Sequence, residues 1–164
     1  MSQAAQTQTE DLLQAAMQMS GVDDKILLGG HRYIKLTEWN GFKRVDIRFW
    51  RDDTIPTKEG VSLQLTQWKD LCDMTGVIDD LMTRVIDQEP VDWRYHLGED
   101  TYVTIKAPYT CVNIRRFWIP NGEWTLKPTK KGVSLNWKEW QELKKTIPVF
   151  EAKEPELRRL MTLI

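Results

Sequence analysis

The sequence is poor in the side chains that build metal sites and covalent catalytic sites, because its 164 residues include only two cysteines and two histidines. Cys72 and Cys111 lack the paired spacing of zinc ligands, and neither His31 nor His96 lies near them in sequence. The sequence also lacks a glycine-rich phosphate loop and a nucleophile beside a histidine. We therefore expect reduced thiols, no metal, no cofactor, no catalytic residues and no enzymatic activity.

Long apolar runs are missing as well. No stretch approaches the length that spans a membrane, and the N-terminus has no basic region followed by an apolar one. We expect a soluble intracellular protein, nuclear or cytoplasmic, that is not secreted and has no membrane partner.

An excess of positive charge is also lacking, since the formal net charge is −1. The charges are nevertheless segregated: residues 28–63 carry 7 Lys and Arg against 5 Asp and Glu, and residues 98–135 carry 6 against 3. Phosphate binding requires clustered cations rather than a basic whole protein. The composition argues against indiscriminate coating of duplex DNA and is compatible with local nucleic-acid binding.

An internal duplication is the strongest feature that the sequence does contain. Residues 56–63, Pro-Thr-Lys-Glu-Gly-Val-Ser-Leu, return 72 positions later as Pro-Thr-Lys-Lys-Gly-Val-Ser-Leu, and a tryptophan follows each copy at Trp68 and Trp140. Upstream, the run that ends in Phe49-Trp50 returns as the run that ends in Phe117-Trp118. These repeats predict a first unit at residues 28–86, a linker at 87–96 that contains Pro90, and a second unit at 97–150.

The first hairpin is predicted residue by residue, because Asn40-Gly41 is a strong two-residue turn signal. This turn pairs Trp39 with Phe42 and, further along, Tyr33 with Arg48. Side chains then alternate between two faces. The core face carries Ile34, Leu36, Val45 and Ile47. Aromatic and charged side chains are interleaved on the opposite face, which carries Tyr33, Lys35, Trp39, Phe42, Arg44, Asp46 and Arg48.

The second hairpin follows the same rule, with Tyr102 opposite Arg115. Its core face carries Val103, Ile105, Val112 and Ile114, and its other face carries Tyr102, Thr104, Lys106, Asn113 and Arg115. Asn121-Gly122 predicts a further turn, after which residues 124–127 and 133–135 are expected to form the last two strands. Residues 52–54 are the shorter counterpart in the first unit.

Each unit is expected to end in a helix. In the first unit an apolar stripe with one polar member runs at helical spacing through Trp68, Leu71, Thr75, Ile78, Met82 and Val85. In the second unit Asn136 and Glu139 have the spacing of a capping box. Pro148 and Pro155 are expected to break this helix and leave a separate helical segment at residues 151–164. Residues 1–27 form either a tail or a short amphipathic helix near residues 7–17.

These features together resemble the single-stranded-DNA-binding domain of the transcriptional coactivator positive cofactor four family, present as two tandem copies over about three quarters of the chain. The resemblance rests on an Ile-Arg…Trp strand and on the Pro-Thr-Lys-x-Gly-Val-Ser-Leu…Trp junction, each occurring twice. It implies an α+β fold in which each unit is a curved four-stranded antiparallel sheet followed by a helix. It also implies that the two units pack as an intramolecular pseudo-dimer with the helices at its centre.

The resemblance also implies which side chains contact nucleic acid. The hairpin-tip aromatic of the family falls on Trp39, its strand arginine on Arg48 and Arg115, and its strand tryptophan on Trp50 and Trp118. Its basic residues before the glycine fall on Lys58, Lys130 and Lys131, with Lys127 just upstream. Together with the outer faces of the hairpins, this gives the candidate binding residues Tyr33, Lys35, Trp39, Phe42, Arg44, Arg48, Trp50, Lys58, Lys106, Arg115, Trp118, Lys127, Lys130 and Lys131.

Two departures from the family pattern predict that the nucleic-acid-binding surfaces of the two units differ. Glu59 replaces a cation in the first unit, and the second hairpin has no aromatic residue at the matching tip position. We expect the first unit to contribute stacking and the second to contribute charge.

The resulting hypothesis is sequence-tolerant binding of single-stranded DNA in transcription regulation or replication, with transcription or replication proteins as further partners. Single-stranded RNA is an alternative, because nothing in the sequence reads or rejects a 2′-hydroxyl. A protein-interaction module that kept the fold and lost nucleic-acid binding is a third reading. For the four tryptophans at positions 50, 68, 118 and 140, core packing competes with a role in stacking.

Overall fold

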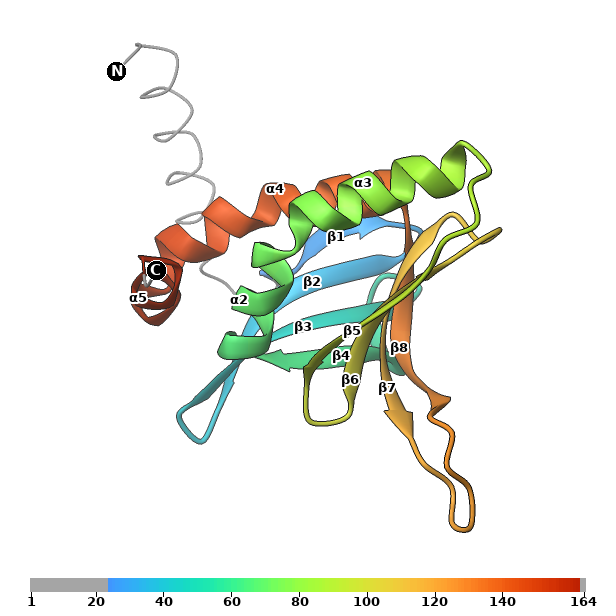
Figure 1. The fold of residues 1–164 in the computed structure, drawn as a ribbon. Coiled ribbons are helices and arrows are strands. Elements are labelled where there is room, and N and C mark those ends of the chain that lie inside the picture. The colour runs from blue at the N-terminus through green and yellow to red at the C-terminus, as the bar shows by residue number, and fades with distance from the viewer. Residues whose placement is uncertain (1–23, 163–164) are drawn as a thin grey trace.

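The computed structural model describes residues 24–162, which form two four-stranded antiparallel sheets and four helices (Figure 1). The first sheet has the order β1-β2-β3-β4 and the second β5-β6-β7-β8. The strands are β1 (Ile26–Gly29), β2 (Arg32–Trp39), β3 (Phe42–Arg51), β4 (Ile55–Gln64), β5 (Asp92–Gly98), β6 (Thr101–Lys106), β7 (Cys111–Trp118) and β8 (Lys127–Asn136). The predicted α+β fold of two tandem units is confirmed. The N-terminal helix expected near residues 7–17 lies outside the described residues.

The predicted register of both hairpins is confirmed. Trp39 is opposite Phe42 and Tyr33 is opposite Arg48 in the first hairpin, and Tyr102 is opposite Arg115 in the second. Asn40 and Gly41 adopt the positive φ angles of 50° and 79° that this tight turn requires. The core faces are also as predicted, since every member is buried except the half-buried Leu36.

The predicted pair of strands at residues 124–127 and 133–135 is wrong. Residues 124–126 form no strand, and one continuous strand, β8, pairs with β7 from Trp118 opposite Lys127 to Cys111 opposite Asn136. The turn signal at Asn121-Gly122 belongs to the long loop between these two strands. The fourth strand of each sheet instead precedes the hairpin, as β1 and β5. Strand β5 includes the second half of residues 87–96, the segment expected to be a linker.

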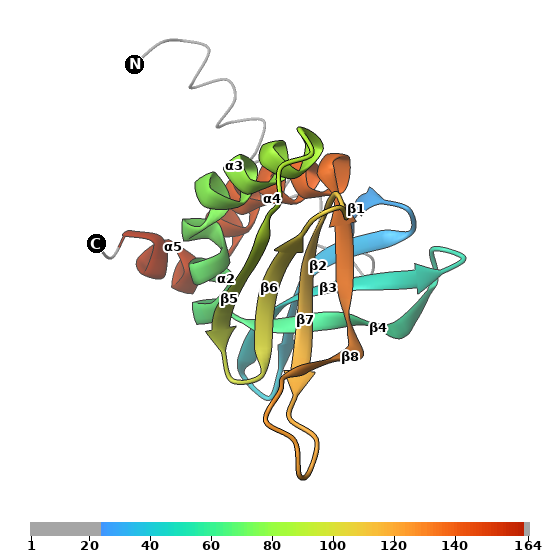
Figure 2. The ribbon, with the colours of Figure 1, turned by 45° about the vertical axis from the view of Figure 1, so that its right-hand side comes forward.

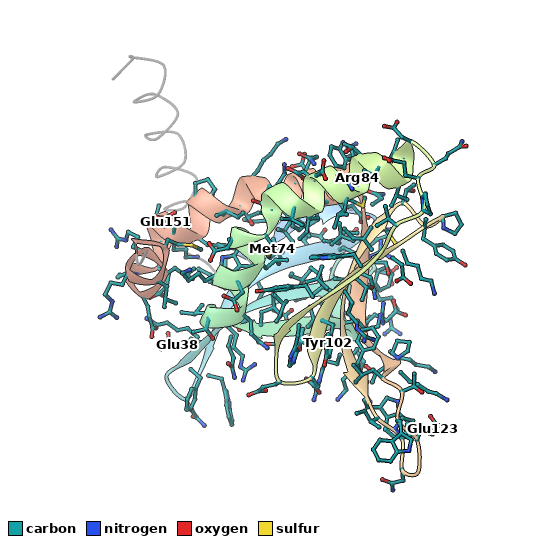
Figure 3. All side chains as sticks on the ribbon, in the orientation of Figure 1. Glu38, Met74, Arg84, Tyr102, Glu123 and Glu151 are labelled. Atoms are coloured by element: carbon teal, nitrogen blue, oxygen red, sulfur yellow. The ribbon has the colours of Figure 1, made fainter. Side chains whose placement is uncertain are left out.

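The buried stripe of the first unit is confirmed, but it belongs to two helices, α2 (Leu65–Asp73) and α3 (Thr75–Ile86). Trp68, Leu71, Ile78, Met82 and Val85 are all buried. The chain departs from helical geometry at Met74, which has φ −96° and ψ 4° and lies at the junction of the two helices (Figure 3). Because residues on both sides of the junction are buried, the apolar pattern gives no sign of the break.

The helix of the second unit, α4 (Trp137–Lys153), begins as predicted and ends later than predicted. Asn136 Oδ1 accepts a hydrogen bond from the Glu139 backbone at 2.8 Å, and Glu139 Oε1 accepts one from the Asn136 backbone at 3.0 Å. Pro148 lies inside α4, so the expected break there is wrong. Its neighbours Val149 and Phe150 are buried, and such packing stabilises a helix more than a lost backbone hydrogen bond weakens it. A final helix, α5 (Pro155–Thr162), begins at Pro155.

The helices of each unit pack across the sheet of the other unit. Helix α3 contacts β6 and β7, and α4 contacts β1. Figures 1 and 2 show α3 and α4 running together along the same side of both sheets. The Trp68 and Phe150 rings meet edge to face at 5.8 Å, which joins α2 to α4. The two units therefore share one hydrophobic core.

Equivalent side chains from the two helix starts reach across this interface. Gln67 Nε2 donates a hydrogen bond of 3.0 Å to the Gly98 carbonyl, and Glu139 Oε2 accepts one of 3.3 Å from Arg32. Gln67 and Glu139 are 72 residues apart, the offset of the duplication, and both are buried. Strands β4 and β8 also contact each other. The two units are thus arranged as an intramolecular pseudo-dimer, as predicted.

Two further observations concern residues 24–162. None of the helices described there is long and apolar enough to cross a membrane. No group of three or more His, Cys, Asp or Glu side chains in this part of the chain is arranged to hold a metal ion.

Candidate nucleic-acid interface

The duplicated Pro-Thr-Lys-x-Gly segment is shaped by an arginine from the neighbouring strand. Arg48 Nη1 donates to the Thr57 carbonyl at 2.7 Å, and Arg115 Nη1 donates to the Thr129 carbonyl at 2.9 Å. Each threonine hydroxyl in turn donates to a backbone carbonyl, that of Phe49 at 2.7 Å or of Arg116 at 2.9 Å. These contacts anchor the bulged start of β4 and of β8 to the sheet.

The glycine of the segment leaves room for that arginine. A Cβ atom on Gly60 would lie 2.8 Å from the Arg48 side chain, and a Cβ atom on Gly132 would lie 2.7 Å from the Arg115 side chain. Both distances are too short for any real Cβ contact. Between the threonine and the glycine the chain presents the exposed residues Lys58 and Glu59 in one unit and Lys130 and Lys131 in the other. The motif therefore fixes a strand bulge that carries solvent-facing charges.

Two grooves related by the duplication lie between the units. The Arg115 groove has a volume of about 650 Å³ and contains the cations Arg32, Lys58, Arg115 and Lys130, with Glu59 on its wall. The Arg48 groove has a volume of about 360 Å³ and contains the cations Arg44, Arg48, Lys58, Arg116 and Lys131, with Glu99 and Asp100 on its wall. Because both units line each groove, neither groove exists in an isolated unit.

Two of the cations in the Arg48 groove are paired with carboxylates. Arg48 donates to both carboxylate oxygens of Asp46, at 2.8 and 3.1 Å. Arg116 Nη2 lies 2.7 Å from Asp100 Oδ2, and the hydrogen bond from Arg116 lowers the pKa of that carboxyl group. Arg116 is absent from the sequence-derived candidates, because strict alternation along β7 assigns it to the face opposite Arg115. The strand pairing shifts register between Arg115 and Phe117, and Arg116 lines the groove at this point.

An aromatic pair extends the Arg48 groove. Trp39 and Phe42 are 76% and 70% exposed at the tip of the β2–β3 hairpin, as the register predicts. With Thr37, Arg44 and Ser62 they line a shallow pocket of about 390 Å³. Arg44 and Ser62 also line the Arg48 groove, so the exposed rings and the groove cations belong to one continuous surface.

The remaining first-unit candidates gather on the outer face of the sheet. The Tyr33 and Trp50 rings meet edge to face at 6.2 Å, and Lys35 Nζ lies 5.7 Å from the centre of the Trp50 ring. The Tyr33 hydroxyl donates to Asp53 at 2.9 Å. Trp50 is half-buried and packs against Tyr33 on this outer face, outside the shared core.

The sequence equivalence of Trp50 and Trp118 is wrong. Trp50 is opposite Pro56, and the residue opposite the equivalent Pro128 is Phe117. Phe117 is buried with its ring 5.3 Å from that of Tyr102, as Trp50 contacts Tyr33. Aligning the two Phe-Trp dipeptides requires a one-residue insertion in the second unit. The strand pairing shows no such insertion. Trp118 is 54% exposed at the end of β7.

The other second-unit candidates lie in different places on the surface. Lys106 borders an outer-face pocket of about 590 Å³ together with Arg94 and Phe117. Lys127 Nζ is paired with Glu123 at 3.0 Å, in the loop that projects away from the helices (Figure 3). Lys130 and Lys131 enter different grooves, Lys130 the Arg115 groove and Lys131 the Arg48 groove.

Comparison with known proteins agrees with this architecture. The family model described as Transcriptional Coactivator p15 (PC4) matches residues 26–74 and 106–146, one segment in each unit. A protein named RNA polymerase II transcriptional coactivator from Drosophila melanogaster is 38% identical over 63 residues, which are 37% of this chain and 54% of that protein. The chain thus spans about half the length of this relative. No solved structure matches.

Proposed function

This chain belongs to the transcriptional coactivator p15 (PC4) family, and from that membership we propose that it binds single-stranded DNA with little sequence preference while regulating transcription. In this proposal it acts in the nucleus, with proteins of the transcription machinery as further partners, and binds without catalysing a reaction. The bound strand follows the Arg48 groove, and its bases reach the hairpin tip.

One observation carries the proposal: the exposed pair Trp39 and Phe42 lies on the same continuous surface as a cation-lined groove. Every base has an aromatic face, so stacking on such rings contributes roughly 1–3 kcal/mol per base whatever the sequence. Cations along the groove follow the phosphates, and this attraction weakens as salt rises. Duplex DNA hides its base faces and gains only the second contribution.

A protein-interaction module is the competing function, and the carboxylate partners of Arg48 and Arg116 favour it. Cations that are already neutralised attract phosphate less strongly. Lys58 and Lys131 line the same groove and are exposed, which supports nucleic-acid binding over this alternative.

The test is fluorescence anisotropy with labelled oligonucleotides of equal length: mixed-sequence single-stranded DNA, the matching RNA, and the duplex, each over a range of salt. We expect single-stranded DNA to bind more tightly than duplex, with affinity that falls linearly on a log–log plot against salt. Tighter binding of the RNA than of the single-stranded DNA would identify single-stranded RNA as the ligand. Equal binding of duplex would show that phosphate contacts alone carry the binding and would contradict the preference for single strands. No salt-dependent binding at all would leave the protein-interaction module as the function.

A further inference from the structure

Strand β5 lies at the edge of the second sheet, which has the order β5-β6-β7-β8 (Figure 2). The Ala107 N–H donates to the Val91 carbonyl at 2.7 Å, in the register of the β5–β6 pairing. In an antiparallel pair, every second residue points its backbone N–H and C=O toward the neighbouring strand. Counting from Val91, Asp92 and Arg94 point these groups away from β6, and nothing in residues 24–162 bonds to them there. Such an edge can pair with another strand.

The equivalent edge of the first sheet is shorter and is covered. Strand β1 has four residues and β5 has seven. Helix α4 contacts β1, and a Cβ atom on Gly29 would lie 3.1 Å from Glu139 Cγ. The corresponding contact on β5 is at Gly98, the last residue of the strand, whose carbonyl accepts the bond from Gln67. The first half of β5 is therefore the open edge.

The side chains of this open edge differ between the two faces of the sheet. Asp92 and Arg94 are exposed on the outer face, and neither forms an ion pair within residues 24–162. The Arg94 guanidinium lies 5.6 Å from the centre of the Tyr102 ring. On the inner face the half-buried Trp93 and Tyr95 rings are stacked 6.1 Å apart at an angle of 11°. An acid and a base thus flank a tryptophan along one strand.

This order of side chains is self-complementary. If two copies of β5 pair antiparallel about Trp93, each Asp92 lies opposite Arg94 of the second copy, and opposite charges at directly opposed positions stabilise a sheet. Asp92 and Arg94 are the residues whose backbone groups point outward, so each such pair exchanges both of its backbone hydrogen bonds. Trp93 then faces Trp93 of the second copy at the narrower spacing, where side chains are closest. Pairing about Arg94 would instead place arginine opposite arginine.

We propose that a second copy of this chain docks on the open edge of β5, with the pairing centred at Trp93. The second sheets of the two molecules then form one continuous antiparallel sheet. An interface built on one strand edge is small, so the dimer forms reversibly and dissociates on dilution. This inference goes beyond the proposed function and does not depend on it.

Two charge variants test the pairing. Arg94→Asp gives the edge two acidic residues, and Asp92→Arg gives it two basic residues. Each variant alone places like charges opposite each other twice, which should raise the dissociation constant of the dimer about tenfold. Mixed in equal amounts, the two variants restore an opposite charge at every position and should associate about as tightly as the wild-type protein. Sedimentation equilibrium over the micromolar range, without nucleic acid, measures these masses.

Hydrogen exchange provides a second measurement, on the backbone of the wild-type protein. The amides of Asp92 and Arg94 should exchange rapidly in dilute protein and slowly in concentrated protein, because only the dimer gives them acceptors. The amide of Trp93 is the matched control, since it points toward β6 and should be protected at both concentrations. Circular dichroism checks the fold of the variants, because Asp92→Arg places a cation opposite Lys106 in the β5–β6 pair.

Three results would overturn the inference. The first is a wild-type protein that stays monomeric across the micromolar range. The second is a dimer whose dissociation constant neither variant changes, because the copies would then meet elsewhere. The third is a failure of the mixed variants to associate while the wild type does. None of these results bears on single-strand binding, which is measured separately with oligonucleotides, so the failure of one proposal leaves the other standing.

Discussion

The indole Nε1 of Trp140 donates a hydrogen bond of 2.8 Å to Asp79 Oδ1, so the helix of the second unit is bonded to the helix of the first. Lys144 Nζ contacts the other Asp79 oxygen at 2.6 Å. Trp68, the counterpart of Trp140, is equally buried, but its Nε1 has no hydrogen-bond partner in the described part of the chain. The Trp140–Asp79 hydrogen bond therefore joins the two units on one side of the pseudo-dimer. In the described residues Trp68 forms no equivalent bond on the other side.

Replacing Asp79 should weaken the association of the two units. Asp79→Ala leaves a buried indole N–H without an acceptor, which costs about 1–3 kcal/mol of the free energy of unfolding. Urea denaturation followed by circular dichroism measures this loss. Asp80→Ala is the matched control, because Asp80 is exposed and pairs with Arg84 on its own helix, a contact worth at most about 0.5 kcal/mol. Equal stability of the two variants would show that the Trp140 contact contributes nothing.

Replacement of glycine by alanine should destabilise the protein at Gly132 and stabilise it at Gly76, because the surroundings of these two glycines differ. Gly132→Ala places a Cβ atom 2.7 Å from the Ile114 carbonyl and from the Arg115 side chain, and relief of this overlap should destabilise the protein by about 1–3 kcal/mol. Gly60→Ala should cost less, because its three closest neighbours all belong to the flexible Arg48 side chain. Gly76→Ala, in α3 with no atom within 4 Å, should stabilise by about 0.5–1 kcal/mol. The melting temperatures of the three variants check this order. A Gly132→Ala protein as stable as the wild type would contradict the conclusion that Gly132 leaves room for Arg115.

Local sequence patterns were sufficient to predict the register of both hairpins and the start of α4. Asn40-Gly41 sets the turn, and period-two alternation then places Ile34 and Val45 in the core and Trp39 outside it. Asn136 and Glu139 form the capping box that their spacing predicts. These features depend on neighbours a few residues away, so no tertiary knowledge is needed to derive them.

Other features were not predictable from local patterns alone. The sequence of α3 does not indicate that this helix packs on β6 and β7, because the same apolar stripe would suit either sheet. The equivalence of Trp50 with Phe117 is set by strand pairing with Pro56 and Pro128, and matching letters point to Trp118 instead.

Removing Lys130 and Lys131 from the bulge of β8 should flatten the salt dependence of single-strand binding. Lys130 lines the Arg115 groove and Lys131 the Arg48 groove, so each single alanine variant reports on one groove. Each should lower the log–log salt slope by up to about 0.7, and the double variant by the sum if the strand contacts both grooves. Lys145→Ala is the control, because this exposed helix lysine lines neither groove and pairs with Glu142. A slope that stays unchanged in the double variant would show that Lys130 and Lys131 are not part of the binding site.

Truncation of Trp39 should separate binding from stability. The register of the β2–β3 hairpin places Trp39 opposite Phe42, at the tip and away from the buried Ile34 and Val45. Trp39→Ala should therefore keep its melting temperature to within about two degrees, as expected for an exposed substitution. It should lose roughly 1–3 kcal/mol of single-strand affinity, the contribution of one stacked base. Anisotropy titration and a thermal melt of the same sample measure both quantities.

Trp124→Ala provides a matched control for Trp39→Ala, since Trp124 is also a surface tryptophan and is 97% exposed but lines neither groove. Binding of an oligonucleotide should quench part of the wild-type tryptophan fluorescence, because a base that stacks on an indole ring lowers the intensity of its emission. That part should disappear in Trp39→Ala and persist in Trp124→Ala. If Trp39→Ala instead melts much earlier and binds normally once folded, Trp39 serves packing. If Trp124→Ala loses the quenching, the stacking surface lies on the loop between β7 and β8, and the path along the Arg48 groove is wrong.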